Sequence, residues 1–226
     1  MTDLAIHPLT PDRWDDLVDL FETDSITRMC WCMVTRLSGA ELREFKPADR
    51  KKMFQSLVKQ GKVPGLLAYK GEEAVGWVAV APRGMTPDWN RGRKSSAVEA
   101  EADADDPACW GASCFFVRSG HRKQGMTAEL LEAGIAHAKK GGAKRLEACP
   151  MRHDDKRSAV GMSVGPQRVF ERAGFETVLE RKAGRPLMRL AIKTTAANKT
   201  ATRKKSAPAK KAAPSKKARA PMSSKT

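Results

Sequence analysis

The segment from Trp110 to Pro150 places the strongest constraint on the fold, because it reads as strand, basic glycine turn, amphipathic helix and second strand. A nearly continuous apolar run from Ala112 to Val117 predicts a central strand that is covered on both faces. The apolar residues of the stretch 124–140 recur with the period of a helix and share one face. This alternation of strand and helix predicts an α/β fold with a mixed sheet.

The turn between the first strand and the helix has the composition of a site for a pyrophosphate. Arg122 and Lys123 bring positive charge, and the helix that follows begins with backbone N–H groups that lack intrahelical acceptors. Gly125 lets the backbone approach a ligand without a Cβ in the way. The simpler alternative is an ordinary connection between strand and helix whose basic residues are only solvated.

The stretch from about Trp110 to Leu190 resembles the acetyl-CoA-binding core of the GNAT superfamily of N-acetyltransferases. The phosphate loop of that family reads R/Q-x-x-G-x-G/A, and this chain has Arg122, Gly125 and then, as a departure, Thr127. A second block, SVGPQRVFERAGFETVLERKAGRPLMRL, resembles the later helix of the family, its turn at Ala173 to Phe175 and two closing strands. The resemblance implies a three-layer α/β/α sandwich with a mixed, centrally splayed sheet.

The resemblance also implies an acetyl-CoA-dependent N-acetyltransferase that acts on a primary amine by direct transfer in a ternary complex. Acetyl-CoA, as the co-substrate, would then be held at the positions Phe116, Val117, Arg122, Lys123, Gln124, Gly125, Met126 and Thr127. Backbone N–H groups near the first two of these would bind the thioester oxygen. The alternative is a non-catalytic module with the same fold that binds acetyl-CoA or is tethered to DNA.

A side chain must supply the base that deprotonates the amine. Glu147 is the first candidate, because its apolar neighbours on the strand after the helix would leave a partly desolvated carboxylate. A surface glutamate is the alternative, and His153 and Asp154 in the next loop are further candidates. Family members often use a tyrosine four residues before the glycine of the Gly-Phe turn as general acid. That position holds Phe170, which puts this route to the leaving thiolate in doubt.

The segment MCWCMVTR, from Met29 to Arg36, lies where the resemblance places the amine acceptor. Trp31 could form an aromatic wall for the amine, and Arg36 could pair with a carboxylate of the substrate. Core packing of Trp31 and of the neighbouring thiols is the simpler alternative. The sequence does not identify the amine.

The five cysteines are an odd number at uneven spacing, which argues against a disulfide framework and indicates a reducing compartment. Four of them could be drawn as a thiolate zinc site: Cys30, Cys32, Cys109 and Cys114. Their spacing lacks paired CxxC knuckles, so buried thiols and no metal are expected. The sequence has no signal-peptide pattern and no apolar run of about 18 residues, which predicts a cytoplasmic protein without membrane contact.

Charge divides the chain into residues 1–192, the acetyltransferase-like domain, and residues 193–226, a tail. The tail has eleven Lys or Arg and no acidic residue, whereas the domain has 31 basic and 26 acidic residues. Lysine pairs separated by Ala and Pro resemble the arm of a linker histone and predict a disordered segment.

Such an arm could bind nucleic acid without sequence preference and associate with the nucleoid, or it could be solvated and bind nothing. Within the domain, residues 82–109 read as a long loop with an acidic patch from Glu99 to Asp106. The sequence leaves open whether the chain forms a homodimer.

Overall fold

The computed structural model describes residues 4–90, 106–152, 163–182 and 184–193, which belong to one unit of the chain, Met1–Thr195. The second unit, Ala196–Thr226, lies outside the described residues. Nearly all of the tail and of the acidic patch that the sequence singled out therefore also lie outside them.

A seven-stranded sheet forms the centre of the described unit, in the order β1-β2-β3-β4-β5-β7-β6. The strands are β1 (Ala5–Pro8), β2 (Leu66–Lys70), β3 (Glu73–Pro82), β4 (Cys109–Val117), β5 (Arg145–Ala148), β6 (Glu176–Lys182) and β7 (Arg185–Ala191). All neighbouring strands are antiparallel except β4 and β5, which run parallel. The predicted mixed sheet is confirmed.

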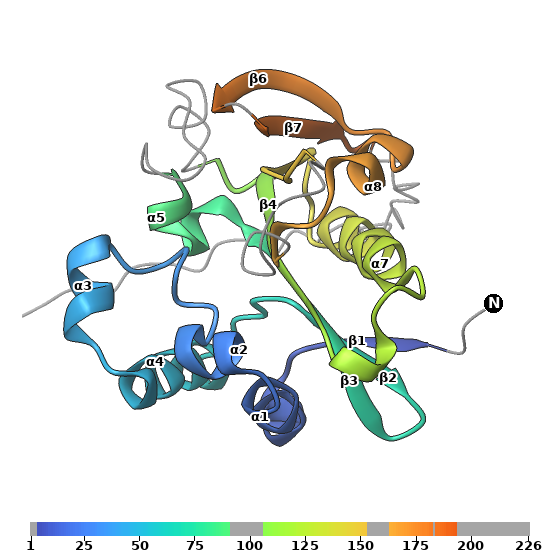
Figure 1. Cartoon of the computed structure of the whole chain (residues 1–226). Coiled ribbons are helices and arrows are strands. Elements are labelled where there is room, and N and C mark those ends of the chain that lie inside the picture. Colours follow the sequence, from blue (N-terminus) through green and yellow to red (C-terminus); the bar gives the residue numbers. More distant parts are fainter. Residues whose placement is uncertain (1–3, 91–105, 153–162, 183, 194–226) are drawn as a thin grey trace, which may run out of the picture. The chain divides into compact units, whose positions relative to one another are not determined.

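Helices cover both faces of this sheet, so the predicted three-layer arrangement is also confirmed (Figure 1). The helices are α1 (Trp14–Glu22), α2 (Ser25–Cys30), α3 (Gly39–Glu44), α4 (Pro47–Lys59), α5 (Pro87–Asn90), α7 (Met126–Lys140) and α8 (Gln167–Arg172). Short 3-10 helices accompany them in the described part of the chain, among them η1 (Pro11–Arg13), η2 (Arg83–Met85) and η3 (Ser119–His121). Helices α2 and α3 have no counterpart in the sequence prediction, and η2 and α5 occupy the start of the stretch that was read as a loop.

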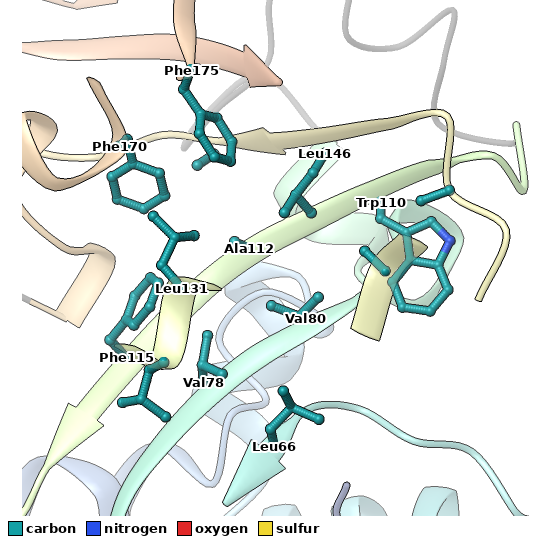
Figure 2. Packing of buried hydrophobic residues seen from close by; sticks show 14 of the residues in the cluster. Leu66, Val78, Val80, Trp110, Ala112, Phe115, Leu131, Leu146, Phe170 and Phe175 are labelled. Carbon is teal, nitrogen blue, oxygen red and sulfur yellow. The ribbon is translucent and has the colours of Figure 1, made fainter. Parts of the chain in front are cut away.

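Alternating residues of β3 show how the sheet divides the core. Val78 and Val80 face α7 and α8 and pack in a cluster with Leu131 (Figure 2). Trp77 and Ala79 face the other way, into a cluster with residues of α1, of α4 and of the turn after α2. Side chains alternate across a strand, so a single ten-residue strand supplies both layers of the core.

Glycines fix both the ends and the position of α7. Gly125 has φ 86°, a left-handed conformation that cannot continue an α-helix, so the helix begins at Met126 and not at residue 124 as the periodicity predicts. A Cβ at Gly134 would lie 2.9 Å from Val80 Cγ2, so only glycine lets α7 approach β3 this closely. The helix ends at Lys140 with Gly141 as its C-cap, and Gly142 again has a positive φ.

Candidate functional site

The turn before α7 is suited to an anion. Gly125 is the N-cap, and a Cβ built on it would meet no atom within 4 Å, so the space at the helix end is open. The first backbone N–H groups of the helix, including those of Met126 and Thr127, have no intrahelical acceptors and carry the positive end of the helix dipole. Gln124 is exposed, and its side chain donates to the Gly120 carbonyl at 3.4 Å.

The two cations of the turn have different surroundings. Arg122 donates from Nε to the Val117 carbonyl at 2.8 Å and from Nη2 to Asp24 at 3.2 Å. Its guanidinium also lies over the Phe116 ring, 5.7 Å from the ring centre. Lys123 is exposed and has φ 63°. Arg122 therefore connects the turn to the N-cap of α2 although its side chain is 45% exposed, and Lys123 is exposed as well.

Strands β4 and β5 separate close to this turn. They pair only over Cys109–Ala112 and Arg145–Ala148, and in the described residues the rest of β4 has no partner on that side. A bulge interrupts β4 at the same point, because Ser113 is an extra residue between the partners of Ala79 and Val80. The backbone groups of β4 beyond the bulge are thus available to a bound molecule, and the predicted central splay is present.

Phe116 and Val117, which the sequence assigned to the thioester, lie in this open part of β4. They pair on the other side with Trp77 and Gly76 of β3. Val117 also accepts the bond from Arg122, so the open edge of β4 leads directly into the turn before α7. The structure therefore brings the two halves of the predicted acetyl-CoA site together.

Trp31 and Arg36 both lie buried on the α1 face of the sheet. Trp31 is 3% exposed and stacks on Trp14, with 6.1 Å between the ring centres, which favours the packing alternative for this residue. Arg36 is 8% exposed, donates from Nη1 to the Cys32 carbonyl at 2.6 Å and lies over the Phe54 ring. Neither side chain forms an open surface for an amine.

A pair of thiols beside Arg36 was not predicted as part of the site. Cys32 Sγ accepts a hydrogen bond from the Trp77 indole N–H at 3.1 Å, and the Cys114 thiol donates to the Phe115 carbonyl at 3.9 Å. The pKa of Cys32 is lowered, first by its interaction with the Cys114 thiol and then, against the effect of burial, by the charge of Arg36 and by the Trp77 N–H. The pKa of Cys114 is raised, first by its interaction with Cys32 and then by burial. The sequence showed two cysteine-containing segments but not that they meet.

Glu147 is part of a buried ion cluster, whereas the sequence predicted a partly desolvated carboxylate. Its Oε2 accepts from Arg83 at 2.8 Å, and its Oε1 accepts from Nε and Nη2 of Arg189 at 2.9 and 2.7 Å. The side chains of Glu147 and Arg83 are both 0% exposed. Both carboxylate oxygens accept hydrogen bonds from guanidinium groups, so this geometry does not suit a general base. The other predicted bases, His153 and Asp154, lie outside the described residues.

Phe170 occupies the position at which a tyrosine was considered. It is fully buried and makes edge-to-face contacts with Phe115 and Phe175, with ring centres 5.9 and 5.2 Å apart. The single tyrosine of the sequence, Tyr69, donates to Asp16 at 2.7 Å, and its pKa is raised first by burial and then by this bond. Neither residue offers the site an acidic hydroxyl.

Within residues 4–90, 106–152, 163–182 and 184–193, no three His, Cys, Asp or Glu side chains are grouped so that they could hold a metal ion. The helices of the described part of the chain are also too short or too polar for any of them to span a membrane.

Several solved structures are similar to this chain at low sequence identity. The PaiA N-acetyltransferase from Thermoplasma acidophilum, in complex with coenzyme A, is 12% identical with a TM-score of 0.48, over 84% of this chain and 99% of that chain. An acetyltransferase from Thermus thermophilus is 19% identical with a TM-score of 0.48, over 84% and 97%. The diaminobutyrate acetyltransferase EctA from Paenibacillus lautus, in complex with L-2,4-diaminobutyric acid and coenzyme A, is 13% identical with a TM-score of 0.46, over 84% and 96%.

None of the curated protein sequences compared with the chain matches it. A protein-family model does match, and its description is acetyltransferase (GNAT) family. The match extends over residues 18–175, which includes the α1 face, the splayed strands, the turn before α7 and α8. The match covers more than half of the chain and shows that the chain belongs to the GNAT acetyltransferase family.

Proposed function

We propose that the protein is an acetyl-CoA-dependent N-acetyltransferase that transfers the acetyl group to a primary amine, directly and within a ternary complex. The observation that carries this proposal is the open edge of β4, which continues into the N-terminus of α7. Acetyl-CoA has the matching chemistry, because its extended arm contains amide groups that pair with a strand edge and its diphosphate suits a helix N-terminus.

Each part of the site has a defined task in this reaction. Backbone N–H groups from Gln124 to Thr127 bind the diphosphate, and Lys123 adds positive charge. The N–H groups of β4 beyond the bulge at Ser113 polarise the thioester carbonyl and stabilise the oxyanion of the tetrahedral intermediate. The leaving group is a thiol with a reference pKa of about 8.5, which needs little help to depart near neutral pH.

A second candidate function is acetyl-CoA binding without catalysis. It is favoured by one specific observation: the positions at which an acid and a base were sought hold Phe170 and the ion-paired Glu147. Such a protein would retain the anion-binding turn and the open strand edge, so the site geometry suits both candidates. Turnover distinguishes them.

Two measurements on the purified full chain test the proposal. We expect calorimetry to show binding of acetyl-CoA, and we expect a thiol reagent to detect CoA release when a primary amine is added. The amines to try are ethanolamine, lysine, 2,4-diaminobutyrate and a lysine-containing peptide. The matched control for each is the same compound with every amine acetylated. Binding without thiol release for every amine would support the second candidate, and absence of binding would contradict both.

A further inference from the structure

The connection between β4 and α7 is tied to neighbouring elements by two arginines. Arg118 pairs with Asp19 of α1 and with Glu73 at the start of β3. Arg122 pairs with Asp24, with 3.2 Å between Nη2 and Oδ2, and no second carboxylate of the described residues lies within ion-pair distance of it. The Arg122 side chain is 45% exposed, compared with 18% for Arg118. A ligand at the turn can therefore replace the partner of Arg122 more readily than those of Arg118.

The two carboxylate oxygens of Asp24 have separate tasks. Asp24 is the N-cap of α2, and its Oδ1 accepts a hydrogen bond from the Ile26 backbone N–H at 2.8 Å. Its Oδ2 is the oxygen that pairs with Arg122. The capping bond needs no negative charge, because asparagine caps a helix as well as aspartate does. The ion pair with Arg122 can therefore break while α2 keeps its N-cap.

Arg122 lies between this carboxylate and the proposed diphosphate site. Its Nε is anchored on the Val117 carbonyl at 2.8 Å, and Gly125, three residues later, is the N-cap of α7. With Nε held, the Nη end of the guanidinium is the part that can change partner. An exposed ion pair with a carboxylate contributes little free energy, whereas a guanidinium forms strong charge-assisted hydrogen bonds with phosphate. A diphosphate at this turn therefore competes with Asp24 for the same cation.

We propose that Asp24 is a positioning residue that holds Arg122 toward α2 in the free protein and releases it to the diphosphate when acetyl-CoA binds. This inference rests on the acetyl-CoA site of the proposed function. Binding then replaces one ion pair with another, and the carboxylate of Asp24 is left to solvent. CoA contains the same diphosphate as acetyl-CoA, so the competition by Asp24 lowers the affinity for both. The carboxylate thereby favours release of CoA after the transfer.

Asp24→Asn tests the exchange, because asparagine keeps the capping bond and removes the competing charge. We expect this variant to bind acetyl-CoA and CoA about fivefold more tightly than the wild type at low ionic strength, the upper range for an exposed ion pair. Calorimetry with each nucleotide measures the gain. The gain should shrink at about 1 M salt, where the Debye length is about 3 Å. Equal or weaker binding by Asp24→Asn at low salt would overturn the proposal.

Two controls separate this exchange from a general change of charge. Asp19→Asn removes the same charge from a neighbouring ion pair, but Arg118 retains Glu73, so we expect affinity within about twofold of the wild type. An equal gain in Asp19→Asn would contradict a specific role of Asp24. In the Arg122→Met background, Asp24→Asn should give no gain, because the cation for which the two anions compete is absent. A gain that persists without Arg122 would overturn the exchange.

Turnover with the amines named above separates this inference from the proposed function. We expect CoA to inhibit Asp24→Asn at about fivefold lower concentration than the wild type, since the product gains the same affinity. A wild type that turns over an amine, with unchanged nucleotide affinity in Asp24→Asn, would overturn the exchange and leave the proposed function intact. A gain in affinity without thiol release for any amine would instead overturn the enzyme and support the exchange. Absence of acetyl-CoA binding would overturn both.

Discussion

Replacing Gly125 with glutamate is expected to abolish measurable acetyl-CoA binding while the protein stays folded. The new carboxylate would stand at the N-cap of α7, where we propose that the diphosphate binds. Two unit charges about 5 Å apart repel by about 3 kcal/mol at an effective dielectric constant of about 20. One such repulsion weakens binding by about two orders of magnitude, and a diphosphate carries more than one charge. Calorimetry with acetyl-CoA measures the loss.

The strain of the substitution needs its own control, and the other end of the same helix offers one. Gly142 has φ 87°, compared with 86° for Gly125, and at neither residue would a Cβ meet an atom within 4 Å. Gly142→Glu thus forces the same residue into the same left-handed backbone, at a cost of about 1–2 kcal/mol of stability. We expect both variants to lose similar thermal stability and only Gly125→Glu to lose binding. Equal affinity in the two variants would contradict a diphosphate site at this turn.

The parts of the structure that could be predicted from the sequence are those set by local residue patterns. The turn at Gly125 and the apolar face of α7 depend on neighbours within a few positions, and both were readable. Helices α2 and α3 have six residues each, too few for a period of 3.6 to show. The capping box of Ser38 and Glu41 at the start of α3 was the one local signal of that helix.

The contacts that could not be predicted from the sequence join segments that are distant along the chain. Trp31 and Cys32 both have positive φ, at 45° and 51°, and this turn after α2 places the Cys32 sulfur against the Trp77 indole N–H. Non-glycine residues rarely adopt a positive φ, so no local sequence pattern predicts this turn. The motif CWC drew attention to this segment, but only the folded structure shows that Trp31 and Cys32 are both buried in the core.

The surroundings of Glu147 could not be predicted either, because its partners Arg83 and Arg189 are distant in the sequence. Substitution of Glu147 should have the largest effect on stability. Glu147→Ala removes the carboxylate that Arg83 and Arg189 share, and Arg83 is fully buried. Removal of one partner from a buried ion pair costs about 3–5 kcal/mol, because charge stays behind in the interior. In a domain of this size that loss corresponds to a fall in Tm of about 10 °C, which thermal unfolding followed by circular dichroism measures.

Two further variants separate the structural role from a catalytic one. Glu132→Ala removes an exposed carboxylate from α7 and should leave stability within about 0.5 kcal/mol. Glu147→Gln retains the shape of the side chain but not its charge, so we expect a lower Tm and near wild-type kcat at a temperature where the variant is folded. A base contributes about two to four orders of magnitude to the rate. If Glu147→Gln lost that much activity at unchanged Tm, the carboxylate would act as the base despite its two arginine partners.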